Sequence, residues 1–210
     1  MKYSRLSSIL FFSIILLSIS AQENLHFHIS GGLVSPFNSK RGGSILGKAQ
    51  YNFDRQFSLY FQSGYLSYGE YYLNYEIDHE RKRIADELDH EVIPILFGGR
   101  YTAVNESSWH PFIEVELGAS IYNFQKGDII PRYHPDTGEL VQFDRINQRE
   151  ENKVLVSYGV GLGITHEITQ NFGTEIGLKL NSNLDDEYSI LLGGRGTYTT
   201  IYWGFVFYFV

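Results

Sequence analysis

Histidine and serine side chains that could carry out chemistry stand close together in the segment NLHFHISGGL, residues 24–33. His28 and Ser30 are two residues apart, so an extended strand would carry both on one face. A serine beside a general base is the arrangement of a nucleophilic hydrolase. His26 and His28 have the spacing of two metal ligands, but no further histidine or carboxylate is clearly in register with them. We therefore predict neither a metal site nor a cofactor.

Charged residues within otherwise apolar segments form a second group with possible chemistry. Arg100 and Glu114 lie at equal distances from an expected turn at 105–110, so they should be cross-strand neighbours. Because a buried charge without a partner is costly, we expect such residues to pair in an interior network. The expected members are Lys48, Arg100, Glu114, Glu116, Glu167, Glu175 and Lys179. This network would be either a path for protons or ions or a structural plug.

The composition excludes several classes of protein. The 210-residue chain has no cysteine, which excludes disulfides, thiolate metal sites and cysteine nucleophiles. The net charge of −7 argues against nucleic acid as a partner. Glycine and aromatic residues are abundant, with 21 Gly, 16 Tyr, 15 Phe and 2 Trp, and this favours strands and turns over helices.

The first segment is expected to be removed from the mature protein. Residues 1–21 have the pattern of a secretory signal peptide, with Lys2 and Arg5 before the apolar run 9–19. That run is too short to span a bilayer as a helix. Small residues permit cleavage before Ala21 or before Gln22. We predict an exported protein with one domain at 22–210.

Apolar and polar residues alternate along eight segments of the mature chain. In residues 111–124, Ile113, Val115 and Leu117 are apolar, whereas Glu114 and Glu116 between them are charged. A period of two residues is typical of β-strands. The eight predicted strands are 24–33, 44–53, 57–66, 91–103, 111–124, 154–168, 171–181 and 199–210. Each has the length that a tilted strand needs to cross hydrocarbon.

The links between these strands alternate between short and long. The short links are near 54–55, 105–110 and 169–171, and the long links are near 35–43, 69–90, 125–152 and 182–198. Short periplasmic turns and long external loops are typical of an up-and-down outer-membrane barrel. We expect an all-β, eight-stranded antiparallel transmembrane β-barrel with both termini in the periplasm.

Which face meets water separates a membrane barrel from a soluble lipocalin-like barrel. The uncharged faces carry large side chains, as contact with lipid requires, and the other faces carry glycine and charged residues. Those small and charged residues suit the narrow, filled interior of eight strands, which favours a plug over a channel. Aromatic residues flank the short turns, where a membrane-interface girdle is expected. They are Phe53, Phe57, Tyr101, Trp109, Phe172 and Phe209.

These patterns resemble the eight-stranded outer-membrane β-barrel family of the OmpX and OmpA-transmembrane-domain type. The resemblance covers nearly the whole mature chain, including HEVIPILFGGRY, VSYGVGLGITHEITQNFGTEIGLKL and the aromatic last strand. It implies recognition of that strand by the barrel assembly machinery. Such barrels usually end in an aromatic residue, whereas here Val210 follows Phe209.

The long loops are the expected seat of function. The candidate interaction residues are Tyr71, Tyr72, Tyr75, Asp185, Asp186 and Glu187. Residues 125–152 contain a predicted hairpin that turns at 135–138 and extends two strands above the membrane. We predict a non-enzymatic, monomeric protein with a structural or surface-interaction role, in contact with outer-membrane lipid and lipopolysaccharide.

Three alternatives belong to other classes. The first is a membrane-embedded lipid hydrolase that uses His28 and Ser30, although Ser30 is expected to point inward, away from lipid. The second is a small solute or ion channel, similar to a porin. The third is a soluble, secreted ligand-binding barrel.

Overall fold

The computed structural model describes residues 24–37, 39–77, 80–104, 106–184 and 196–209. The predicted signal peptide, residues 1–21, lies outside the described residues. Among the residues described, no helix is long and apolar enough to cross a bilayer. The strands are β1 (Leu25–Pro36), β2 (Gly42–Asn52), β3 (Phe57–Tyr68), β4 (Tyr71–Ile77), β5 (Glu80–Thr102), β6 (Trp109–Tyr133), β7 (Leu140–Thr169), β8 (Phe172–Leu184) and β9 (Tyr198–Tyr208).

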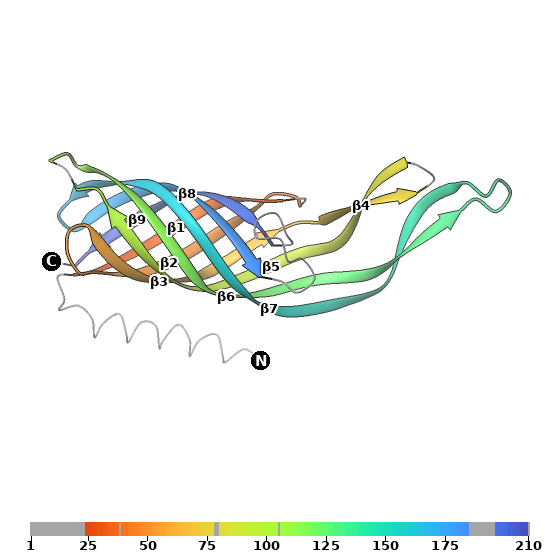
Figure 1. Ribbon diagram of the computed structural model, residues 1–210, viewed down its shortest axis with the longest axis horizontal. Helices are drawn as coiled ribbons and strands as arrows, with labels where there is room; N and C mark the ends of the chain where they lie inside the picture. Colours follow the sequence, from red (N-terminus) through yellow and green to blue (C-terminus); the bar gives the residue numbers. More distant parts are fainter. Residues whose placement is uncertain (1–23, 38, 78–79, 105, 185–195, 210) are drawn as a thin grey trace.

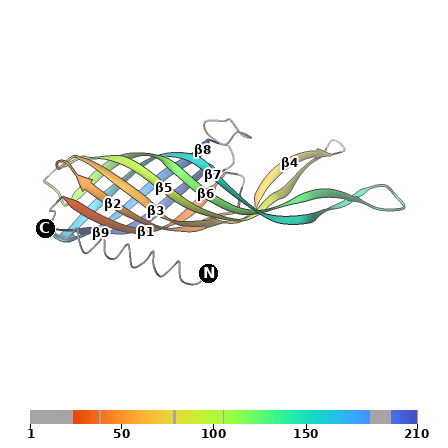
Figure 2. The ribbon, with the colours of Figure 1, turned by 90° about the horizontal axis from the view of Figure 1, so that it is seen from below.

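The strands form one antiparallel sheet that closes into a barrel (Figures 1 and 2). The order is β3-β2-β1-β9-β8-β7-β6-β5-β4, and an additional pairing of β3 with β5 closes the ring. Eight strands therefore make the wall, and β4 lies outside it as the partner of the first part of β5. The predicted fold class is confirmed. Closure leaves no free sheet edge within the barrel, which an open sheet would have.

The short links gather at one end of the barrel, called here the turn end. At this end Asn52 pairs with Ser58, and Thr169 pairs with Phe172. The described ends of the chain lie there too, since His26 of β1 pairs with Tyr208 of β9. The predicted rhythm of short and long links is confirmed, and the opposite end is called the hairpin end.

Two hairpins project from the hairpin end (Figures 1 and 2). The longer one was expected: β6 and β7 stay paired from the barrel to Tyr133 and Leu140, and Gly138 takes a φ of +68° in the connecting turn. The shorter one was not expected, because residues 69–90 were predicted to be a loop. Instead, β4 pairs with β5 from Tyr71 to Glu80.

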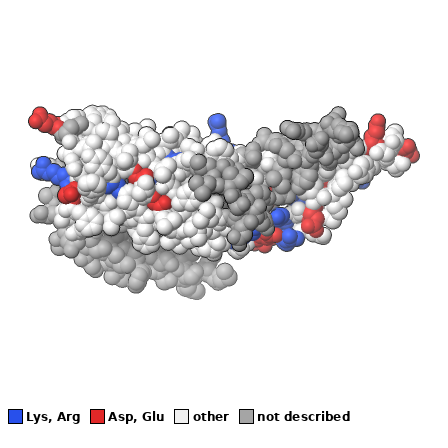
Figure 3. Space-filling model, in the orientation of Figure 1, with Lys and Arg blue, Asp and Glu red and all other residues white. Residues whose placement is uncertain are grey.

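The outward face of the wall is apolar. On β6, Ile113, Val115 and Leu117 are each 61% exposed, whereas Glu114 and Glu116 between them are buried. Figure 3 shows a largely white barrel surface, with a few charged atoms visible on the middle of the barrel and others at the turn end and along the hairpins. So large an apolar surface would be unfavourable in water and suits hydrocarbon. This orientation is the opposite of that in a soluble barrel.

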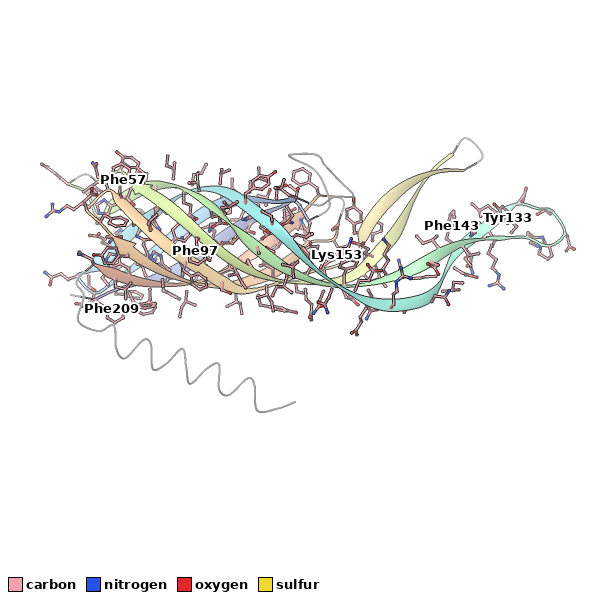
Figure 4. All side chains as sticks on the ribbon, turned by 60° about the horizontal axis from the view of Figure 1, so that its bottom comes forward. Phe57, Phe97, Tyr133, Phe143, Lys153 and Phe209 are labelled. Carbon is pink, nitrogen blue, oxygen red and sulfur yellow. The ribbon has the colours of Figure 1, made fainter. Side chains whose placement is uncertain are left out.

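Aromatic side chains ring the turn end. Phe57 contacts Tyr101, and Phe27 contacts Phe209, with ring centroids 5.0 and 5.4 Å apart. Trp109 stacks on His166 at 4.0 Å. In Figure 4, Phe57 and Phe209 lie at this end, and Phe97 lies on the wall. The arrangement fits the predicted girdle, in which amphipathic rings occupy the membrane interface.

Two chemically different layers fill the interior. Toward the turn end lies the charged layer, described below. Toward the hairpin end lies an apolar and aromatic cluster, called here the aromatic layer. Its members are Val34, Leu46, Leu66, Tyr68, Val92, Tyr122, Phe124 and Tyr198. Inward-facing glycines make room for large neighbours: a Cβ at Gly98 would overlap the Tyr60 ring, and one at Gly161 would lie 2.9 Å from Glu114 Cγ.

Candidate functional site

The charged layer is centred on Glu114, which β6 places on its inward face. Its carboxylate lies 2.8 Å from Lys48 Nζ of β2 and 2.9 Å from Lys179 Nζ of β8. All three side chains are almost completely buried. A buried carboxylate is tolerable only when cations and hydrogen bonds compensate for its lost hydration, and here two ammonium groups do so.

Glu116, two residues further along β6, has a second set of partners. Lys179 Nζ lies 2.8 Å from one carboxylate oxygen, and the Tyr60 hydroxyl donates to the same oxygen at 3.0 Å. The Asn181 amide donates to the other oxygen at 2.6 Å. Lys179 also donates to Gln62 Oε1 at 2.7 Å. Lys179 therefore joins both carboxylates of β6 across the barrel.

Arg100 holds the part of the charged layer nearest the turn end. Its guanidinium donates to Glu175 at 2.9 Å and to the Thr165 hydroxyl at 2.5 Å. The same group lies 3.5 Å above the centre of the Phe112 ring, a cation–π contact. His28 Nδ1 lies 3.2 Å from the same Glu175 oxygen.

Six of the seven predicted network residues lie together in the interior. They are Lys48, Arg100, Glu114, Glu116, Glu175 and Lys179, three cations and three anions. The predicted register of Arg100 opposite Glu114 is confirmed. Arg100 nevertheless makes its ion pair with Glu175, two strands further round the wall.

Glu167 is the exception in this set, and its expected place in the network is wrong. Its side chain is exposed at the turn end, 3.5 Å from His110 Nε2. The residue shares the inward parity of β7, but it is only two residues from the end of the strand, where the barrel opens to solvent. Alternation predicts the face of a residue, whereas its depth depends on the position along the strand.

Sequence reasoning did not assign Tyr60, Gln62, Thr165 and Asn181 to the network. Each lies at an inward-parity position of its strand, so the alternation that identified the charged members also contained this signal. Their polar groups form hydrogen bonds with oxygen and nitrogen atoms of the six charged residues. They convert a set of ion pairs into a connected network.

The aromatic layer separates the charged layer from the hairpin end. His90 stacks between Tyr68 and Phe124, with centroids 4.8 and 5.4 Å away. Its Nε2 lies 3.0 Å from the buried carboxylate of Glu87. Val34, Val92 and Leu66 beside it have almost no exposed surface. This packing supports the interpretation of the interior as a plug.

A cavity of about 590 Å³ opens at the turn end. His28, Arg100 and Thr165 of the charged layer line its inner part, and the short turns supply its rim. Ser30, the second member of the possible hydrolase pair, has the inward parity of β1 as expected. Within the described ranges, no group of three or more histidine and acidic side chains is arranged to hold a metal ion.

The structure places the predicted loop interaction residues in different environments. Tyr71 is only 6% exposed, so its expected place on the surface is wrong. Tyr72 is partly exposed, and its hydroxyl hydrogen-bonds Glu70, whose carboxylate also pairs with Lys40 at 3.0 Å. These two partners hold the pKa of Glu70 below its usual value. The side chain of Tyr75 and the residues Asp185, Asp186 and Glu187 lie outside what the structure describes.

The longer hairpin carries surface ion pairs along its ladder. Arg132 pairs with Asp144 at 3.4 Å, and Arg149 lies 2.9 Å from Glu151 and 3.8 Å from Asp128. Figure 4 shows Tyr133 and Phe143 toward the tip, and Lys153 near the point where β7 leaves the barrel. The hairpin is thus a charged ribbon with aromatic side chains near its end.

Solved structures of outer-membrane proteins share this fold. The chain is similar to Neisserial surface protein A, with a TM-score of 0.51, 13% identity, and coverage of 88% of this chain and 96% of that one. A major outer membrane protein of Thermus thermophilus has a TM-score of 0.53 and 8% identity, and the match covers 87% of this chain and 98% of that one. OprG of Pseudomonas aeruginosa has a TM-score of 0.50 and 9% identity, and the match covers 89% of this chain and 97% of that one. No family model and no curated protein matches the chain.

These similarities define the class of protein by its fold. The chain has the fold of the small eight-stranded outer-membrane β-barrels, and the resemblance found in the sequence is confirmed for the fold. At such low identities the comparison does not extend to a partner or an activity.

Proposed function

We propose that the protein is an integral outer-membrane β-barrel without enzymatic activity, and that its projecting hairpins bind partners at the cell surface. The observation that carries this proposal is the β6–β7 ladder, which continues well beyond the barrel. Pairing of β5 with β6 ends at Glu87 and Lys126, and pairing of β7 with β8 starts at Val156. Among the described residues, the ribbon between these points has strand edges without a ladder partner.

Such edges favour a polypeptide partner. An unpaired strand presents backbone N–H and C=O groups that an extended segment of another chain can match. The paired charges of Arg132 and Asp144 limit nonspecific pairing, and the exposed ring of Tyr133 supplies apolar contact area. The barrel then serves as a rigid membrane anchor for a binding ribbon.

The remaining features of this proposal concern topology and assembly. The signal peptide 1–21 is removed, and the mature domain 22–210 spans the membrane as a monomer. Both termini lie in the periplasm, and the hairpins lie outside the cell, near lipopolysaccharide. The apolar outward series of β9, which includes Trp203, Phe205 and Phe207, supports recognition by the barrel assembly machinery.

Cysteine labelling tests the topology directly, because the chain has no cysteine of its own. Thr137→Cys places one thiol at the tip of the longer hairpin, and Gln56→Cys places one in a short turn. Intact cells treated with a membrane-impermeant maleimide should label Thr137→Cys and not Gln56→Cys. Labelling of Gln56→Cys alone would contradict the proposed orientation.

A shortened hairpin tests the binding role. In this variant, residues 129–146 are replaced by a short glycine–asparagine turn, and the barrel strands remain unchanged. Cells that produce the full chain should adhere to protein-coated surfaces more strongly than cells that produce the shortened chain at the same surface level. Equal adhesion would contradict a role of the ribbon in binding these proteins.

A further inference from the structure

The cavity at the turn end has an unusual inner lining. Three side chains around it are at least nine-tenths buried, those of His28, Gln50 and Arg100, and the side chain of His110 is nearly so. Each has a buried nitrogen or oxygen atom without a hydrogen-bond partner among the described residues, namely His28 Nε2, Gln50 Oε1, Arg100 Nε and His110 Nδ1. Buried polar atoms are almost always paired, so unpaired atoms on four side chains around one cavity point to an occupant.

The other contacts of these side chains show which atoms accept hydrogen bonds. His28 Nδ1 lies 3.2 Å from a Glu175 carboxylate oxygen, a position that favours the proton on Nδ1 and Nε2 as an acceptor. His110 Nε2 lies 3.5 Å from the Glu167 carboxylate, which favours its Nδ1 as an acceptor in the same way. The Gln50 amide nitrogen donates to Asn52, so its oxygen accepts. Among these four atoms Arg100 Nε is the donor, and the Tyr208 hydroxyl, which also lines the cavity without a hydrogen-bond partner among the described residues, can donate or accept. The occupant therefore needs donors for three acceptor atoms.

The inner part of the cavity favours a hydroxyl group. His28 and Arg100 both lie against the same oxygen of Glu175, so the two side chains line the same part of the cavity. A hydroxyl group can donate to a ring nitrogen and accept from a guanidinium at the same time. An ammonium group at this depth would instead meet the positive charge of Arg100.

The rim favours a positive charge. Three carboxylates lie there, those of Asp54, Glu106 and Glu167, against the single guanidinium of Arg55. Backbone N–H groups of Phe57 and Gln56 donate to Asp54 and hold its pKa below the usual range, so this carboxylate is ionised at neutral pH. A cationic group of the occupant is therefore best placed at the mouth.

We propose that the turn-end cavity binds a small hydroxylated amine of the amino-sugar class. Its hydroxyl groups lie toward His28, Arg100 and Gln50, and its ammonium group lies near Glu167. Val104 and Val206 also line the cavity and offer apolar contact to the carbon face of a sugar ring. The volume of about 590 Å³ is within the range of small-molecule sites. This inference does not depend on the surface-binding role of the hairpins.

Calorimetric titration of the folded mature chain in detergent micelles tests the proposal with three probes. Glucosamine carries hydroxyls and an ammonium group, glucose carries hydroxyls only, and gluconate carries hydroxyls and a carboxylate. Glucosamine should bind saturably and about tenfold more tightly than glucose, with gluconate weakest. Equal responses to all three, or none, would overturn the proposal and leave a cavity that holds only water.

Two variants separate the parts of the site. Glu167→Gln, at an exposed position, should weaken the binding of glucosamine by about fivefold to tenfold and leave the binding of glucose unchanged, because it removes a charge at the mouth of the cavity. Gln50→Leu should weaken the binding of both sugars, because it removes an inner hydrogen-bond acceptor. Asp144→Asn, on the distant hairpin, is the matched control and should change neither.

The fold of each variant is checked by its shift in gel mobility on heating. If folded Glu167→Gln keeps the full preference for glucosamine over glucose, the assignment of the ammonium group to the rim is wrong and the proposal fails. The preference for glucosamine over glucose should also shrink as salt rises from about 0.05 to about 0.5 M, because salt screens the attraction between the ammonium group and the carboxylates of the rim.

Discussion

The two layers of the barrel interior use the same strands for opposite purposes. On β6, Glu114 and Glu116 lie in the charged layer, and Tyr122 and Phe124 lie in the aromatic layer. The charged layer depends on particular partners, because each ion is stable only beside its counter-ion. The aromatic layer depends on volume and closure, which several apolar side chains can provide. Polar groups near the turn end thus have a cavity beside them, whereas apolar and aromatic side chains fill the interior toward the other end.

The largest expected effect breaks the charged layer. Lys179→Met removes the cation that Glu114 and Glu116 share and leaves the interior with an excess of negative charge. We expect the free energy of unfolding to fall by about 3–5 kcal/mol, the usual cost of an uncompensated buried charge. Urea unfolding in micelles, followed by the fluorescence of Trp109 and Trp203, measures this.

The control for that variant is Lys40→Met. Lys40 also pairs with a glutamate, Glu70, but its side chain is 60% exposed. Solvent screens such a pair, so we expect no measurable loss of stability. A similar loss in both variants would mean that burial does not distinguish the two ion pairs.

A smaller effect is expected in the aromatic layer. Leu66→Ala leaves a void among Val92, Tyr122 and their neighbours, and we expect a loss of about 2–4 kcal/mol in the same urea experiment. In planar bilayers both the wild type and this variant should remain without stable conductance, because aromatic rings still fill the section. Steady single-channel currents from the wild type would contradict the closed interior.

The contribution of a single hydrogen bond should be smaller again. Tyr60→Phe removes the hydroxyl that donates to Glu116 but keeps the ring beside Lys48, whose ammonium lies 4.5 Å from its centre. Glu116 retains Lys179 and Asn181, so we expect a loss of about 1–2 kcal/mol. Tyr198→Phe in the aromatic layer is the comparison, and a larger loss there would reverse the assigned roles of the layers.

The sequence predicted the wall and its facing better than the contacts inside it. A period of two residues and the alternation of link lengths determine strand, face and neighbour, and the register of Arg100 opposite Glu114 follows from one short turn. The pairing of Lys48 with Glu114 joins residues 66 apart in the chain. It depends on how far the strands shift around the closed barrel, and no local pattern reports that shift.

The hairpin end was the least predictable region. The run DHERKRIADELDH, residues 78–90, lacks the alternation of a strand with one apolar face, yet the backbone of its part from Glu80 to Glu87 pairs with β4. Outside a membrane, both faces of a ribbon can be polar, so the hydrophobic pattern that identifies strands is lost. Tyr71 was expected on the surface for the same reason, because a position in a supposed loop gave no indication of burial.

The smallest expected effect lies outside both layers, in the short turn between β2 and β3. Asp54 accepts backbone N–H bonds from Gln56 and Phe57, each at 2.7 Å, and these bonds lower the pKa of its carboxyl group. A lowered pKa stabilises the fold above the unfolded value of about 3.9, and this stabilisation is lost as pH falls through the folded value. Asp54→Asn should therefore unfold at slightly lower urea than the wild type between about pH 6 and 7. The difference should shrink below about pH 4, where the wild-type carboxylate becomes protonated. A difference that stays constant to about pH 3 would mean that the ionised carboxylate does not stabilise this turn.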